Sequence, residues 1–291
     1  MKKPLLFLLI ILCAASAYGR KNAKQQQKRY ELIWHDEFDK DGRPGKDWTF
    51  EKGFVRNEEL QWYQEENAIV KGGCLIIEGR KQRIENNAYE EGSANWKKNR
   101  PYAEYTSSSL TTRNSFSFRY GRVEVRAKIP TASGSWPAIW LLGNKYEWPQ
   151  NGEIDMLEYY IKDGTPSILA NACRGSNKRW DAVWNSKVTP LSYFTAKDKE
   201  WAAKFHIWRM DWDKDFIRLY LDDELLNEID LKQTANQGYD GNIVNPFSND
   251  IPGFGDYILL NLAIGANGGT PDDEAFPLRY EIDYVRVYRQ I

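Results

Sequence analysis

Three carboxylates lie within six residues near the middle of the chain. Glu153, Asp155 and Glu158 are separated by apolar residues. Side chains alternate between the two faces of a strand, so Glu153 and Asp155 share a face while Glu158 would point the other way. A β-bulge within Met156-Leu157 would return Glu158 to the face of the other two acids. We expect that bulge, because without it an unpaired carboxylate would be buried in the interior.

A row of acids on one wet face is typical of retaining glycoside hydrolysis. That reaction needs two carboxyl groups about 5–5.5 Å apart, one as nucleophile and one as acid and then base. A third carboxylate between them can raise the pKa of the acid, or hydrogen-bond the nucleophile in its protonated form. The spacing alone leaves two other interpretations open: a solvated acidic strand face, and a calcium site made of oxygen ligands.

Tryptophan residues flank the acids. Trp136 and Trp140 share parity just upstream, and Trp148 follows before the acidic run. Twelve Trp among 291 residues is a high count. Flat apolar rings suit the C–H faces of sugars, although aromatic side chains also fill protein cores. Three Trp beside a carboxylate row therefore favour a sugar-binding cleft over a calcium-binding adhesion module.

The elements that position these residues are predicted to be strands. Short runs of β-forming residues are separated by Gly, Pro, Asn and Asp. The clearest are Glu31–Trp34, Leu75–Glu78, Gly121–Ile129, Ala138–Leu142, Glu153–Tyr160, Ile207–Trp212, Ile217–Leu221, Tyr257–Ile264 and Tyr284–Tyr288. One short helix is expected over Ala196–Lys204. The pattern, without internal repeats or a linker, predicts an all-β chain folded as a two-sheet sandwich or jelly roll.

Composition excludes several classes of protein. Forty Lys and Arg against 41 Asp and Glu give a net charge of −1, which excludes a strongly basic nucleic-acid binder. A hydrophobic content of 42% with 28% charged residues excludes wholesale disorder. Three Cys exclude a disulfide-built scaffold, and two His leave little material for a histidine-rich metal site. We expect Cys74 and Cys173 to be free thiols.

The amino terminus has the order of a secretory signal peptide: basic residues, an apolar run and then small residues. We expect residues 1–19 to be a signal peptide and residues 20–29 a flexible lead-in, which predicts a secreted or periplasmic protein. Cys13 offers a lipid anchor as an alternative, although Leu12 suits a lipoprotein cleavage site poorly. No segment has 18 consecutive apolar residues, so we expect no membrane span.

Together these motifs resemble glycoside hydrolase family 16, in the laminarinase-like branch with the longer, bulged signature Glu153-Ile154-Asp155-Met156-Leu157-Glu158. The supporting motifs are Asn57–Tyr63, Tyr105–Ser108, Tyr120–Ala127 and Leu259–Gly265. The resemblance implies a concanavalin A-like β-jelly roll of two curved antiparallel sheets, whose concave sheet forms an open cleft. Residues 30–291 would be the single catalytic domain.

The resemblance also implies roles for the three acids. Glu153 would be the nucleophile, Glu158 the general acid/base, and Asp155 the assistant of the nucleophile. The glycosyl-enzyme would form on Glu153, and water activated by Glu158 would release it with the anomeric configuration retained. The chemistry would require no cofactor. The partner would be a polysaccharide, and we expect a monomer that binds no nucleic acid.

The same resemblance places residues around the substrate. Trp136, Trp140 and Trp148 match aromatic positions around the cleaved sugar, and Asn57 matches a polar residue on the nonreducing side. Typical laminarinases carry His on the strand after the acids, whereas residues 167–175 contain none. We expect Asn171 to hold that position instead.

Many relatives hold a calcium ion far from the cleft. Glu37 and Asp283 are the candidate ligands for such a structural calcium, and ordinary edge-strand acids are the alternative interpretation.

We therefore expect a secreted retaining endo-glycosidase that hydrolyses internal β-linkages of β-1,3- or mixed β-1,3/1,4-glucan. The missing His leaves an alternative open, an endo-β-galactosidase acting on agar-like or host-glycan galactosyl chains. A noncatalytic carbohydrate-binding protein is a further alternative, although the presence of all three acids argues against it. The sequence does not separate hydrolysis from transglycosylation.

Overall fold

The computed structural model describes residues 29–241 and 243–291. The predicted signal peptide over residues 1–19 and the lipid-anchor alternative at Cys13 lie outside the described residues, as does the predicted lead-in over residues 20–29 except for its last residue. Within the described part of the chain, no helix combines the length and the apolar character needed to cross a membrane.

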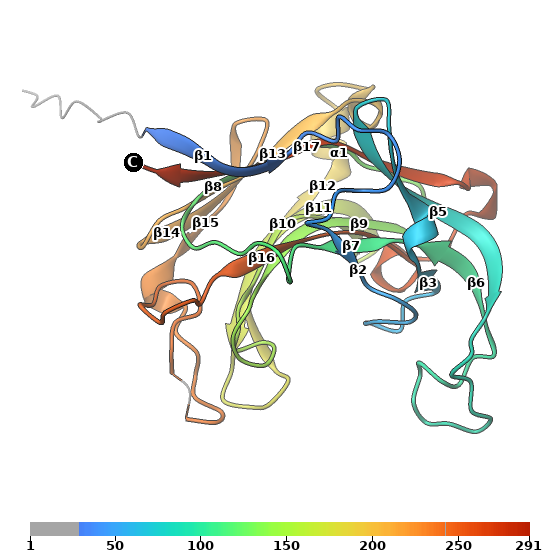
Figure 1. Cartoon of the computed structure of the whole chain (residues 1–291), viewed down its shortest axis with the longest axis horizontal. Coiled ribbons are helices and arrows are strands. Elements are labelled where there is room, and N and C mark those ends of the chain that lie inside the picture. The colour runs from blue at the N-terminus through green and yellow to red at the C-terminus, as the bar shows by residue number, and fades with distance from the viewer. Residues whose placement is uncertain (1–28, 242) are drawn as a thin grey trace, which may run out of the picture.

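Two β-sheets pack face to face (Figure 1). The side chains between them form one hydrophobic core. In spatial order the ten-stranded sheet contains β15 (Glu224–Asp230), β14 (Phe216–Leu221), β13 (His206–Trp212), β8 (Gly121–Lys128), β17 (Leu278–Gln290), β5 (Cys74–Glu85), β6 (Tyr102–Ser107) and β3 (Gln61–Tyr63), with β1 (Tyr30–Asp36) beside β17 and β4 (Ala68–Lys71) beside β5.

The seven-stranded sheet carries the residues of interest. Its spatial order is β12 (Ala182–Pro190), β11 (Thr165–Gly175), β10 (Glu153–Lys162), β9 (Ser135–Gly143), β16 (Asp256–Ile264), β7 (Ser109–Thr111) and β2 (Thr49–Phe50). Its pairings are antiparallel, as are those of the other sheet except for the parallel pair β3–β6. The predicted fold class, an all-β jelly roll, is confirmed.

Across the described residues, helical structure is confined to short segments. These are α1 (Leu191–Thr195) and the 3-10 turns η1 (Glu65–Asn67), η2 (Trp201–Ala203), η3 (Leu231–Gln233), η4 (Ala266–Gly268) and η5 (Asp273–Ala275). The expected helix over Ala196–Lys204 is wrong. The side chain of Asp198 accepts the N–H of Glu200 at 3.0 Å, a local turn that competes with helical pairing. Phe194 and Trp201 instead stack in the core, with ring centroids 5.3 Å apart.

Strand alternation sorts the side chains as predicted. Along β8, Val123, Val125 and Ala127 are buried and the residues between them are half-buried. β1 pairs with β17, so the first and last strands lie side by side at the left of Figure 1. Cys74 and Cys173 are free thiols, as expected.

Candidate active site

Strand β10 contains the bulge expected from the spacing of the acids. Asp155 pairs with Asn171 on β11, whereas Glu158 pairs with Leu169. Two residues of β10, Met156 and Leu157, therefore lie opposite the single residue Ala170 of β11. The register against β9 shifts at the same place. One extra residue therefore reverses the alternation between Asp155 and Glu158.

The bulge separates acids from apolar side chains. Ile154, Met156, Leu157 and Tyr159 all belong to the core between the sheets. The three acids line a cavity of about 750 Å³ on the opposite face of the seven-stranded sheet. The predicted residues Trp136, Trp140, Trp148, Asn57 and Asn171 line the same cavity.

Two indoles and one amide donate hydrogen bonds to the outer acids. Trp148 Nε1 donates to Glu153 Oε2 at 2.7 Å. Glu158 accepts from Trp136 Nε1 and from Asn171 Nδ2, both at 3.0 Å. These donors fix the orientation of each carboxylate and favour its charged form.

Burial and mutual repulsion act against the charged forms. Burial and the charge of Glu153 raise the pKa of Glu158 to about 7. Burial, together with the charges of Glu158 and Glu153, raises the pKa of Asp155 well above its usual range. The protonated form of Asp155 is therefore favoured, and its side chain is hydrogen-bonded with that of Glu153.

Glu153 is held differently from its neighbours. Burial raises its pKa, while hydrogen bonds from Trp148 and Asp155 and the positive charge of Arg56 lower it. The row thus contains a central acid whose pKa is raised well above its usual range, an outer acid, Glu153, whose burial is partly offset by donors, and an outer acid, Glu158, with a pKa of about 7. Environments that drive neighbouring pKa values apart are typical of acid/base catalysis.

Arg56 and Glu59 also line the cavity, and the sequence analysis missed them. Glu59 is 2% exposed and its Oε1 accepts from Asn57 Nδ2 at 3.2 Å. The Arg56 guanidinium lies 5.0 Å from the ring centroid of Trp140 and pairs with Glu51. Glu59 falls within Asn57–Tyr63, a motif that supported the family resemblance, and the expected position of the adjacent Asn57 beside the substrate is the signal that could have indicated both residues.

Each of the two proposed calcium ligands is paired with an arginine side chain. Glu37 accepts two hydrogen bonds from Arg286, at 2.9 and 2.7 Å, and Asp283 accepts one from Arg126 at 2.6 Å. In the described part of the chain, no group of three or more His, Cys, Asp or Glu is placed to hold a metal ion. As they stand, Glu37 and Asp283 do not fit a calcium site.

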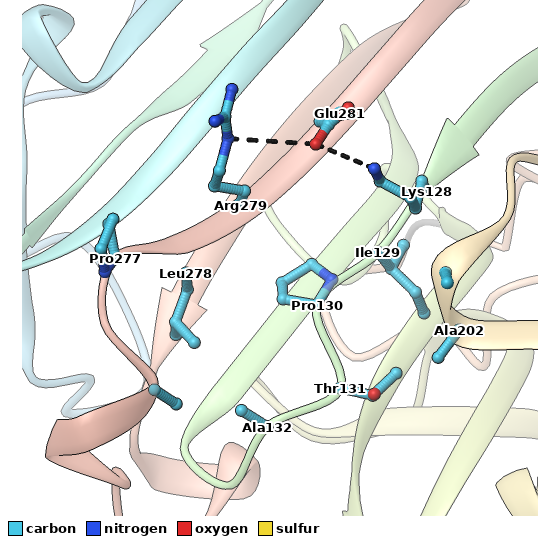
Figure 2. A pocket seen from close by; sticks show the side chains of 12 residues that line it. Lys128, Ile129, Pro130, Thr131, Ala132, Ala202, Pro277, Leu278, Arg279 and Glu281 are labelled. Atoms are coloured by element: carbon cyan, nitrogen blue, oxygen red, sulfur yellow. Dashed lines mark ion pairs between the residues drawn. The ribbon is translucent and has the colours of Figure 1, made fainter. Parts of the chain in front are cut away.

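A second hollow, of about 380 Å³, lies on the ten-stranded sheet (Figure 2). Its charged residues form ion pairs with one another, because Glu281 lies 3.0 Å from Lys128 and 3.9 Å from Arg279. The rest of its wall is mainly aliphatic and includes Pro130 and Leu278. This hollow offers no group arranged for chemistry.

The jelly roll and the buried carboxylate row define a glycoside hydrolase. Residues 64–249 match the sequence model of Glycosyl hydrolases family 16, and the chain belongs to that family. The beta-glucanase of Rhodothermus marinus is 33% identical over 98% of this chain and 94% of its own length. The chain is therefore an endo-acting glycoside hydrolase.

Two solved structures give the structural comparison. The laminarinase catalytic domain of Thermotoga petrophila superposes with a TM-score of 0.70 at 31% identity, covering 90% of this chain and 99% of that one. A structure from work on endo-acting O-glycanases, which human gut microbiota express to initiate mucin breakdown, gives a TM-score of 0.76 at 35% identity. That match covers 89% of this chain and 91% of the other.

Proposed function

We propose that the protein is a retaining endo-β-glycosidase that cleaves internal linkages of β-1,3- or mixed β-1,3/1,4-glucan. The bulged row of Glu153, Asp155 and Glu158 in one cavity carries the proposal. The substrate class is supported by the relatives, which include a beta-glucanase and a laminarinase. No cofactor takes part in the chemistry.

In the first step the protonated Glu158 donates its proton to the glycosidic oxygen, and Glu153 attacks the anomeric carbon. The bond from that carbon to the leaving oxygen breaks as the bond to Glu153 forms. Glu158, now ionised, then takes a proton from water as the water attacks the same carbon. Glu153 leaves and the anomeric configuration is retained.

Asp155 assists Glu153 in this proposal as the protonated acid, the form that burial and the neighbouring charges favour. Its hydrogen bond to Glu153 stabilises that carboxylate as a leaving group in the second step, without adding a negative charge. The indole of Trp148 supplies a second donor to Glu153. Trp136 and Asn171 position Glu158 in the same way.

A second candidate substrate is a β-galactosyl chain. Asn171 stands beside Glu158 where laminarinases are expected to carry His, and an amide does not titrate near neutrality. The similarity to a structure from work on mucin O-glycanases points the same way.

We propose a signal peptide over residues 1–19, a secreted or periplasmic monomer with one catalytic domain over residues 30–291, and lipidation at Cys13 as the alternative.

The test is hydrolysis of laminarin, lichenan, agarose and mucin-type galactosyl glycans by the purified protein. Glu153→Gln should lower kcat at least about 1000-fold, or about 4 kcal/mol in activation free energy. The matched control is Glu91→Gln, an exposed glutamate outside the cavity, which should match the wild type. Release from the glucans supports the proposal, and release from galactosyl glycans alone selects the second candidate. Silence on all four polymers contradicts both.

A further inference from the structure

The strands beside β10 extend the site as three rows of facing residues. Cross-strand partners on one sheet face lie next to one another. The rows from β10 through β11 to β12 are Glu153–Cys173–Trp184, Asp155–Asn171–Ser186 and Glu158–Leu169–Val188. The residues of β12 in these rows all line the cavity that holds the acids.

The face of β12 toward the cavity is apolar and uncovered. β12 is the edge strand of its sheet. Trp184 is 46% exposed and Val188 is 37% exposed. Within the described residues, the indole of Trp184 stacks against no other aromatic ring. An exposed indole in a cavity, with a hydroxyl two residues along at Ser186, suits the C–H face and hydroxyl groups of a pyranose.

The position of this face of β12 relative to the acids indicates which part of the substrate it contacts. Asn57, expected on the nonreducing side, lies on the other side of β10 from β12, because the guanidinium of the adjacent Arg56 lies over Trp140 on β9. A chain that crosses the strands from Asn57 over β10 therefore reaches Trp184 on the leaving-group side. Two strand spacings separate β10 from β12, about 9.6 Å. That distance exceeds the reach of the sugar directly attached to the broken bond.

We propose that Trp184, with Ser186, forms a subsite that stacks on the second sugar of the leaving group. The inference rests on the proposed endo-glycosidase function. It specifies that the substrate needs at least two sugar units on the leaving-group side. The ligand is a neutral pyranose two units beyond the cleaved linkage.

The test compares two substrates that share their nonreducing part. One is the 4-nitrophenyl glycoside of a β-1,3-linked glucotriose, whose leaving group stops short of β12, and the other is the β-1,3-linked glucohexaose. If the wild type cleaves only galactosyl glycans, the corresponding galactosyl pair is used. Trp184→Ala should lower kcat/KM about tenfold on the hexasaccharide and less than twofold on the aryl glycoside. Trp184→Phe should restore most of the loss.

Trp180→Ala is the matched control, because Trp180 is 55% exposed and does not line the cavity. It should match the wild type on both substrates. A reducing-end label gives a second readout: Trp184→Ala should move cleavage toward the reducing end, since weaker binding of the leaving group favours positions with fewer sugars there.

Equal losses on both substrates, no loss on either, or a shift toward the nonreducing end would overturn the subsite while leaving the proposed function intact. A wild-type protein that cleaves neither series would overturn the proposed function, and the subsite with it.

Discussion

Asn171 combines two tasks at one position of β11. Its Nδ2 donates to Glu158, and it pairs in register with Asp155 across the strands. The amide holds no charge of its own, so it orients the acids without competing for their proton. At the scale of single residues, burial and the charge of Glu153 raise the pKa of Glu158, and hydrogen bonds from its two donors lower it.

This balance predicts the pH dependence. The activity needs protonated Glu158, so kcat/KM should fall as pH rises through about 7. Hydrogen bonds from Asn171 and Trp136 favour the ionised form and lower the pKa of Glu158. Asn171→Ala should therefore move this basic limb to higher pH, with a maximal rate about two- to tenfold lower. The measurement is kcat/KM from pH 5 to 9.

Trp136→Phe removes the other donor and serves as the companion variant. It should move the limb in the same direction. A limb that stays in place or moves to lower pH in both variants would show that Glu158 is not the group titrating there.

At the scale of elements, the loop before β3, supported by the β5–β6 connection, forms the side of the cavity opposite β12. The loop before β3 carries Asn57 and Glu58, which have positive φ values of 56° and 53°. Such backbone is costly away from glycine and persists where its surroundings hold it. The β5–β6 connection supplies that support, because Arg100 Nη2 donates to the carbonyl of Glu59 at 2.9 Å and its guanidinium lies 3.8 Å from the ring centroid of Phe54.

Removal of this support should weaken binding rather than chemistry. Arg100→Ala is expected to raise KM about three- to tenfold and to leave kcat within about twofold, because Asn57 is placed to contact substrate in the ground state and the transition state alike. Steady-state kinetics on the cleaved polymer measure both constants. Arg83→Ala is the control, since Arg83 lies over Tyr102 instead. A fall in kcat with KM unchanged would refute this assignment.

At the scale of the whole molecule, the two sheets have different roles. The seven-stranded sheet carries the acids and the indoles, while the ten-stranded sheet covers its inner face and bears ion pairs on the outside. Arg122 pairs with Asp211 at 2.6 Å across β8 and β13, and Arg126 pairs with Asp283 across β8 and β17. Partly exposed pairs of this kind contribute about 0–1 kcal/mol each, so the core supplies most of the stability.

These pairs predict how the fold responds to calcium. Because Glu37 and Asp283 each hold an arginine, addition of calcium or of a chelator should change Tm by less than about 2 °C. A site filled at a hundredfold excess over Kd would add about 2.7 kcal/mol and move Tm by several degrees. Thermal unfolding with calcium or a chelator, with magnesium as the control ion, distinguishes these outcomes.

Local periodicity allowed the sequence by itself to determine the all-β class, the strand faces and the bulge. Alternation has a period of two, so the spacing of Glu153, Asp155 and Glu158 already required one extra residue. The family resemblance also indicated Trp136, Trp148 and Asn171 as residues near the substrate, and these three donate hydrogen bonds to the outer acids.

Only the tertiary structure decided which distant residues join that row. Arg56 and Glu59 meet the acids from a loop about a hundred residues earlier in the chain, and Trp184 extends the site through the successive pairings of β10, β11 and β12. The arginine partners of Glu37 and Asp283, and the core stacking of Trp201 that replaced the expected helix, arise in the same way. The physical reason is that side-chain partners and burial depend on how the sheets close around the core, whereas strand alternation depends only on neighbours along the chain.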